Sequence, residues 1–148
     1  MNAETYLDRI KKIDSMIKNK LRDYARWVEV ADGLGGAALG ERVQSSRNLH
    51  RGSDAIDTYI DIEREINALK KERQSIIATI EQLPSTEYDV IYKLYVEDYT
   101  MKELAYHAGK SYDWVKSKKK HGLELVQGLL DKEERNKRNK DDNFYWGH

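Results

Sequence analysis

The chain has 148 residues, of which 39% are apolar and 35% are charged. It contains no cysteine, which excludes a disulfide framework and a zinc site built on cysteine thiolates. No stretch approaches the roughly 20 apolar residues that span a bilayer, so the sequence predicts no membrane partner and a cytoplasmic location. Apolar residues are few for a thick core and only one proline interrupts the chain, so we expect an all-α fold of long, thin helices.

The charge is unevenly distributed along the chain, although the net charge is zero. Residues 1–100 hold 15 Lys and Arg against 18 Asp and Glu, whereas residues 101–148 hold 11 against 8. The C-terminal part is therefore basic and the N-terminal part acidic. A basic region confined to one end is typical of a protein that contacts phosphates with that end only.

Two long segments have helical patterns of apolar residues. Residues 3–32 and 54–82 repeat apolar side chains at steps of three and four, with Ser53 as the expected N-cap of the second helix. Residues 33–52 begin with four glycines in eight positions and predict a connector, because each glycine costs a helix about 1 kcal/mol. Residues 1–83 are therefore predicted to form a long antiparallel helical hairpin, a coiled-coil-like arm. The pattern leaves open whether its apolar stripe closes within one chain or pairs with a second chain in a homodimer.

The C-terminal part divides into a module and a tail. Pro84 ends the second helix, and residues 86–98 predict a third one. Residues 131–142 are all charged or asparagine, which predicts a fraying helix end or a solvated tail. We therefore expect a module over residues 84–130 and a charged tail over 131–148.

Residues 100–126 predict a helix-turn-helix. Thr100 and Glu103 have the spacing of a capping box, and Ser111 is the expected N-cap of a second helix. Ala105 is small enough for a close crossing of two helices, and Gly109 suits a turn that strains residues with a Cβ atom. The expected core of this module consists of Leu104, Ala105, Gly109 and Val115.

In such a module the second helix lies in the major groove of DNA, with its first residues towards the base edges. The expected DNA-contacting residues all belong to the beginning of this helix: Ser111, Tyr112, Asp113, Lys116, Ser117, Lys119 and Lys120. Lysines suit phosphates or guanine acceptors, and Asp113 suits a cytosine amino group, although a favourable interaction with the helix dipole is the simpler explanation for it. A lysine triplet is often only a solvated face, and we expect at least one of residues 118–120 to lie towards the core.

These residues resemble a known module. Residues 99–105, followed by Gly109, Ser111 and Val115, resemble region four of bacterial sigma factors, which reads the upstream promoter element. The whole chain is similar to small phage and prophage regulators of the group related to RinA, ArpU and LtrC. The resemblance implies a sequence-specific regulator of phage late genes that binds double-stranded DNA in the bacterial cytoplasm, together with the host RNA polymerase. Lys110 and Lys118 depart from the pattern, because aliphatic residues are usual at both positions.

Three other functions compete with this interpretation. An enzyme is disfavoured because the four histidines are scattered and no phosphate-binding glycine loop follows a strand, so we expect no catalytic residue, metal or cofactor. A small-terminase-like subunit for phage DNA packaging also combines a helix-turn-helix with helical oligomerisation, but such subunits place the DNA-binding module first. The third alternative is a helical protein-interaction adaptor whose working part is the hairpin.

Overall fold

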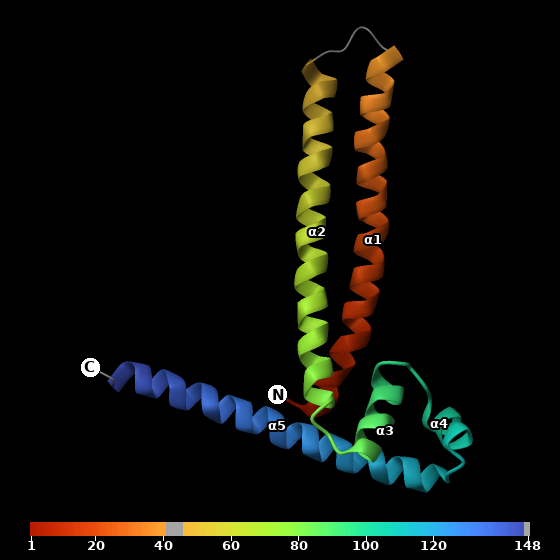
Figure 1. Ribbon diagram of the computed structural model, residues 1–148, viewed down its shortest axis with the longest axis vertical. Coiled ribbons are helices and arrows are strands. Elements are labelled where there is room, and N and C mark those ends of the chain that lie inside the picture. The colour runs from red at the N-terminus through yellow and green to blue at the C-terminus, as the bar shows by residue number, and fades with distance from the viewer. Residues whose placement is uncertain (41–45, 147–148) are drawn as a thin grey trace. The chain divides into compact units, whose positions relative to one another are not determined.

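The computed structural model describes the backbone of residues 1–40 and 46–146, and the side chains of residues 1–33 and 53–141. Every regular element in these residues is a helix, which confirms the expected all-α class (Figure 1). The elements are α1 (Ala3–Gly40), α2 (Ser46–Ile80), α3 (Ser85–Tyr95), α4 (Met101–Ala108) and α5 (Tyr112–Trp146). None of the helices in the described part is long and apolar enough to cross a membrane.

The chain forms two compact units. The two-helix unit comprises residues 13–73, from α1 and α2. The main unit comprises residues 1–12 and 74–148, which include the beginning of α1, the end of α2 and all of α3, α4 and α5.

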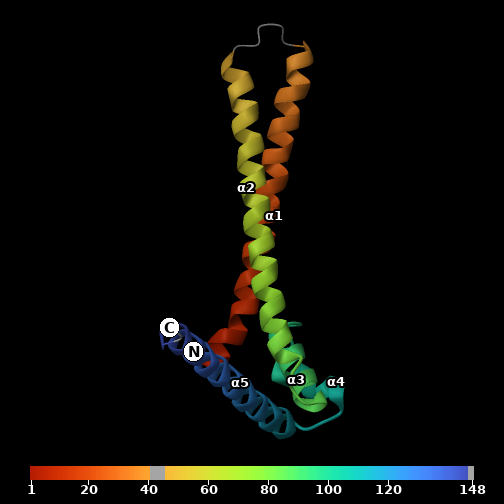
Figure 2. The same cartoon turned by 60° about the vertical axis from the view of Figure 1, so that its left-hand side comes forward.

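In the two-helix unit, α1 and α2 lie side by side and antiparallel (Figures 1 and 2). Three side-chain pairs join them: Asp14 with Arg73, Lys20 with Glu65, and Tyr24 with Tyr59. The residue number falls in α2 as it rises in α1, as an antiparallel pair requires. In α2 the buried apolar side chains include Ile62, Ile66 and Leu69 of the predicted stripe, together with Ala55. In α1 Ile13 is buried, whereas Leu21, which also belongs to the predicted stripe, is 48% exposed.

Arg73 is the one polar residue in the stripe of α2, and it is accommodated by an ion pair. Its Nε atom donates to Oδ1 of Asp14 at 2.7 Å, and both side chains are partly exposed. Such a half-exposed pair contributes at most about 1 kcal/mol. The ion pair therefore makes a polar residue tolerable in the apolar stripe. The packing of α1 against α2 is driven by the apolar residues around it.

The expected connector over residues 33–52 is wrong at both ends. α1 continues to Gly40 and α2 already begins at Ser46, so Ser53 lies inside a helix and does not cap it. Only residues 41–45 of this segment lie outside the described backbone. The glycines are interspersed with Leu34, Ala37, Ala38 and Leu39, which are strong helix formers, and their combined propensity outweighs the cost of the glycines.

The beginning of α1 is fixed to α5 within the main unit. The side chain of Asn2 caps α1 by accepting hydrogen bonds from the amides of Glu4 and Thr5 at 2.7 and 3.3 Å. The Gln127 amide accepts from the backbone N–H of Ala3 and donates to the carbonyl oxygen of Met1, both at 2.8 Å. One side chain of α5 therefore satisfies both a donor and an acceptor at the start of α1.

α3 and α4 are separated by a short connection with one unusual backbone conformation. α3 begins directly after Pro84 and ends at Tyr95, three residues before the predicted end. Asp98 then adopts a left-handed conformation with φ of 64°, which aspartate tolerates better than most residues. The Asp98 carboxylate pairs with the Lys11 ammonium at 2.8 Å, so the connection is also attached to α1 within the main unit.

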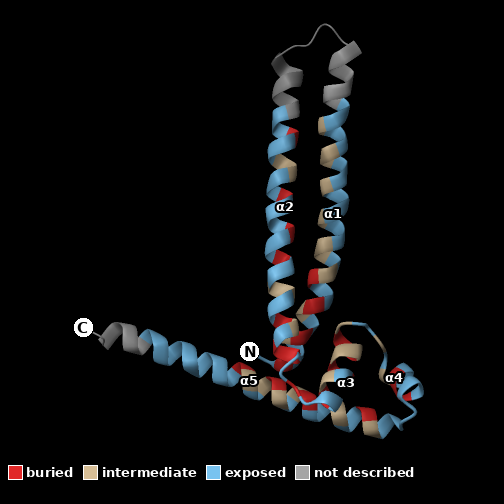
Figure 3. Ribbon diagram, in the orientation of Figure 1, coloured by how far each residue is buried: buried red, intermediate tan, exposed pale blue. Residues whose placement is uncertain are grey.

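α5 is one continuous helix from Tyr112 to Trp146. Its side chains alternate between buried and exposed as far as Leu130, and residues 131–141 are all exposed (Figure 3). The segment predicted as a fraying end or a solvated tail is thus helical and solvated over these residues. The aromatic residues at the end of the chain lie beyond the described side chains.

Candidate nucleic-acid interface

α4 begins with the side-chain cap that its sequence predicts. The Thr100 hydroxyl oxygen accepts a hydrogen bond from the Glu103 amide at 3.1 Å. The same hydroxyl donates to the Glu103 carboxylate at 3.1 Å, which replaces the carboxylate-to-backbone bond of an ordinary capping box. The cap fixes the first turn of this eight-residue helix, which is too short to be stable on propensity alone.

The turn between α4 and α5 depends on a left-handed glycine. Gly109 has φ of 65°, and the following amide, that of Lys110, donates back to the Ala105 carbonyl at 3.0 Å. The Ser111 hydroxyl then accepts from the Trp114 amide at 3.0 Å and caps α5. The left-handed glycine ends α4 and the serine cap starts α5, within three residues. Residues 101–126 are therefore two helices and not one rod.

α3, α4 and α5 pack against each other in all three pairs. Three of the predicted core residues are buried: Leu104, Ala105 and Val115, the last of which is fully inaccessible. α3 contributes Val90, Ile91 and Leu94. Gly109 is exposed and acts through its backbone conformation, so it stabilises the turn and adds nothing to the core.

The crossing of α3 and α5 is closest at Gly122. A Cβ atom at this position would lie 2.6 Å from Cγ1 and 2.9 Å from Cδ1 of Ile91, closer than side-chain atoms approach each other. Gly122 therefore allows α5 to lie directly on α3. The sequence analysis did not single out this glycine, because a lone glycine inside a helical pattern gives no sign of its neighbour.

A buried carboxylate lies beside this crossing. Glu87 of α3 has a side chain only 7% exposed, and its Oε1 atom lies 3.0 Å from Nδ1 of His121 and 3.5 Å from Nζ of Lys118. The hydrogen bond from His121, with a smaller contribution from the Lys118 charge, holds the pKa of Glu87 below its usual value. This cluster explains why Lys118 occupies a position where an aliphatic residue was expected, and it confirms that one of the three consecutive lysines lies towards the core.

The predicted DNA-contacting residues are not all equally exposed. Six of them are exposed, namely Ser111, Tyr112, Asp113, Lys116, Ser117 and Lys120. Lys119 is half-buried and lines a groove beside the starts of α1 and α4. Lys119 therefore differs from the other predicted contacts in burial, since it lies beside the starts of α1 and α4.

An aromatic surface lies on α4 and the connection before it. The ring of His107 lies 5.5 Å from that of Tyr99 and 5.6 Å from that of Tyr106, and Tyr106 is 84% exposed. In the turn before α5, the Lys110 ammonium lies 5.5 Å from the centre of the Trp114 ring, so the turn is also held by a cation–π contact. Lys110 thus has a structural partner in the position where an aliphatic residue was expected.

The described residues contain no group of three or more acidic, histidine or cysteine side chains that could hold a metal ion. The start of α5 is instead exposed and basic. Beneath it lie the apolar core and the Glu87 carboxylate, which is paired with His121 and Lys118. Comparison of the chain with protein-family models, with curated proteins and with solved structures gave no match.

Proposed function

We propose that the protein is a sequence-specific DNA-binding transcriptional regulator, with α4 and α5 forming a helix-turn-helix. The observation that carries the proposal is the break at residues 109–111, which frees the start of α5 as a separate, capped helix. Its inner side is held by Val115 and Gly122, and its outer side presents Lys116 and Lys120 to solvent.

The exposed row on α5 has the geometry of a groove-reading surface. The row consists of Asp113, Lys116, Ser117 and Lys120. They follow one another at steps of three, one and three positions, so they lie on one face of the helix. A major groove about 12 Å wide admits one helix, and a helix inserted by this face would direct these side chains at base edges and phosphates. Tyr112 at the first turn would then contact a sugar or a thymine methyl group.

The roles within this row follow from charge. Lys116 and Lys120 donate to phosphates or to guanine acceptors, and neither has an ion-pair partner in the described part of the chain that would have to be displaced first. Asp113 lies in the first turn of α5, where a carboxylate interacts favourably with the helix dipole. We assign the phosphate contacts to the two lysines and a structural role to Asp113.

The biological setting of the proposal rests on the sequence resemblance alone. By that resemblance, the regulator acts on phage late promoters in the bacterial cytoplasm and works with the host RNA polymerase. The exposed side chains of Tyr106 and His107 on α4, next to the partly buried Tyr99, are available for such a protein contact.

Salt dependence of DNA binding tests the proposal. The double variant Lys116→Ala, Lys120→Ala should weaken binding to a 30-base-pair duplex, and the slope of log K against log salt should flatten by about 2, since each lost phosphate contact removes about 0.9. The control is Lys132→Ala with Lys137→Ala, which removes the same charge from the solvated part of α5.

An unchanged slope in the first variant, or an equal change in the control, would show that α5 does not bind DNA by this face. Selection from a random duplex library then separates a sequence-specific protein from a general one. A regulator should enrich one motif, and the affinity for that motif should exceed that for random duplex by at least about a thousandfold.

A further inference from the structure

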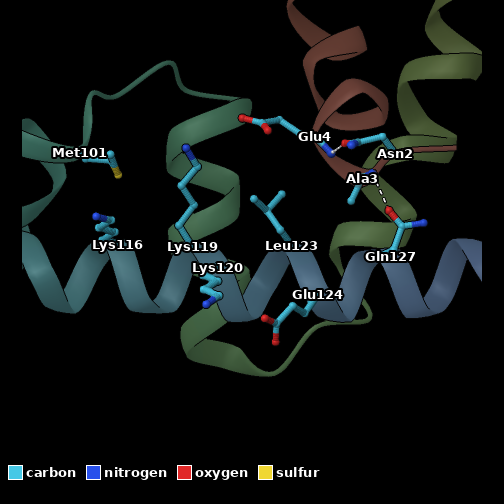
Figure 4. Close-up of a pocket in the computed structure, with 10 residues that line it drawn as sticks. All are labelled: Asn2, Ala3, Glu4, Met101, Lys116, Lys119, Lys120, Leu123, Glu124 and Gln127. Atoms are coloured by element: carbon cyan, nitrogen blue, oxygen red, sulfur yellow. Dashed lines mark hydrogen bonds between the residues drawn. The ribbon is translucent and has the colours of Figure 1, made fainter.

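A groove runs along α5 between the starts of α1 and α4, entirely within the main unit (Figure 4). Its volume is about 520 Å³, within the range of roughly 300–1,000 Å³ that is typical of small-ligand sites. Three lysines of α5 line it: Lys116, Lys119 and Lys120. Figure 4 shows Lys116 and Lys119 rising from α5 on the side of Met101 and Glu4.

The three lysines are uncompensated. Neighbouring Lys118 pairs with Glu87, and Lys11 pairs with Asp98, but none of the three groove lysines forms an ion pair with any residue that the structure describes. Glu4 and Glu124 also line the groove without pairing with them. With three lysines and two glutamates the groove has a formal charge of +1, and a bound anion would compensate it.

The rest of the groove is apolar or already hydrogen-bonded. Ala3, Met101 and Leu123 line it with aliphatic groups, and the Gln127 amide is occupied by the start of α1. Such a lining suits the apolar body of a small molecule. A bare phosphate of a DNA backbone would leave it unused, so the lining favours a ligand that is both anionic and apolar.

An adjoining cavity extends the groove. It has a volume of about 290 Å³ and shares Glu4, Met101 and Lys119 with the groove. Tyr95 also lines it and is only 5% exposed. Burial and the nearby carboxylates of Glu4 and Asp8 raise the pKa of the Tyr95 hydroxyl, so this end of the groove is neutral or acidic and the anionic group belongs at the lysine end.

We propose that this groove binds a small amphipathic anion, a carboxylate, sulfonate or phosphate on an apolar body. The anionic group lies between Lys116 and Lys119, which rise from the same side of α5, and the apolar body lies on Met101 and Leu123 (Figure 4). Because Lys116 also belongs to the DNA-facing row, the ligand and DNA compete for it. The competition rests on the proposed function, whereas the binding itself does not.

The binding is tested with two dyes that differ in charge. The probe is 8-anilinonaphthalene-1-sulfonate, and its comparison is N-phenyl-1-naphthylamine, which has the same rings without the sulfonate. The full-length protein should bind the sulfonate at one saturable site, at least about fivefold more tightly than the neutral dye. Lys119→Gln should weaken sulfonate binding by about five- to tenfold, and the control Lys132→Gln should leave it unchanged.

Amide NMR shifts locate the bound dye. The largest shifts should occur at Ala3, Met101 and Leu123 and should disappear in Lys119→Gln. Equal affinity for the two dyes, equal affinity of the two lysine variants, or shifts elsewhere on the molecule would each overturn the proposal.

A final measurement separates this proposal from the proposed function. Saturating sulfonate dye should raise the dissociation constant for duplex DNA in the wild type, and this effect should be weaker in Lys119→Gln. If dye binding is as expected but the protein binds no duplex, the ligand site stands and the proposed function fails. If the protein binds duplex but not the dye, the reverse holds.

Discussion

At the scale of single residues, the candidate interface depends on a few positions whose local conformations were predictable and a few whose contacts were not. The caps at Thr100 and Ser111 and the turn at Gly109 follow from short-range rules, because each involves residues within a few positions of one another. The cluster of Glu87 with His121 joins residues 34 positions apart. No local pattern distinguishes Glu87 from Asp89, the other acidic residue of α3, so its burial could not be predicted.

Two glycines of α5 should respond in opposite ways to the same substitution. Gly122→Ala places a methyl group against Ile91 and should destabilise the fold by about 1–3 kcal/mol through overpacking. Gly128→Ala meets nothing within 4 Å and should stabilise the helix by up to about 1 kcal/mol. Urea denaturation of both variants measures the difference. Two changes of the same sign would mean that α5 does not cross α3 at Gly122.

The buried carboxylate predicts a pH dependence. Because the folded-state pKa of Glu87 lies below its ordinary value of 4.5, the ionised group stabilises the fold above pH 4.5, and this contribution is lost as the pH falls through the folded-state pKa. Glu87→Gln should therefore cost more stability at pH 6 than at pH 3. His121→Gln should reduce the pH dependence, because the His121 hydrogen bond is the largest cause of the lowered pKa. Unfolding free energies measured from pH 3 to 7 decide the matter, and a cost that is constant with pH would contradict the assignment.

At the scale of whole elements, periodicity predicted the existence of the helices better than their ends. The apolar stripe over residues 54–82 matches the buried positions of α2, whereas the stripe over residues 3–32 is buried only as far as Ile13, and Leu21 within it is 48% exposed. The glycine-rich segment was misjudged because each glycine was counted as a break, while the leucines and alanines between them sustain the helix. α5 was similarly longer than its apolar pattern, because charged residues such as Lys, Glu and Arg also have high helix propensity.

In the candidate interface, too, the sequence predicted the helices better than the surroundings of their side chains. The sequence predicted two helices with a turn and predicted which residues begin the second helix. It did not predict that Lys119 is half-buried, because the residues beside it include the start of α1, more than 100 positions away in the sequence. Nothing within residues 100–126 specifies that contact.

At the scale of the whole molecule, the two-helix unit should promote self-association. Its apolar stripe closes within the chain, but Leu21, Ile56 and Ile60 remain 37–48% exposed. Ile56 and Ile60 are four residues apart and share a face of α2, so a second chain could cover them. We expect sedimentation equilibrium to show a dimer at high concentration, as would suit a DNA site with two half-sites.

The double variant Ile56→Glu, Ile60→Glu should shift this equilibrium to the monomer, because it adds charge to the apolar face. Lys71→Glu is the matched control, since it is an exposed position of α2 and changes the net charge by the same two units. A wild-type protein that sediments as a monomer at every concentration would remove the dimer and leave the chain to bind DNA alone.

The solvated half of α5 has a consequence for how the helix opens. Between Tyr112 and Leu130 the backbone hydrogen bonds are protected by packing, so they break only when the surrounding core opens. Beyond Leu130 no described side chain is buried, and the ion pair of Glu134 with the N-terminal ammonium, which joins this part to the start of the chain, is exposed and adds little stability. Amide hydrogens should therefore exchange with solvent far faster after Leu130 than before it. One continuous helix thus has a slowly and a rapidly exchanging part, and we expect the rapidly exchanging part to unwind without opening the core.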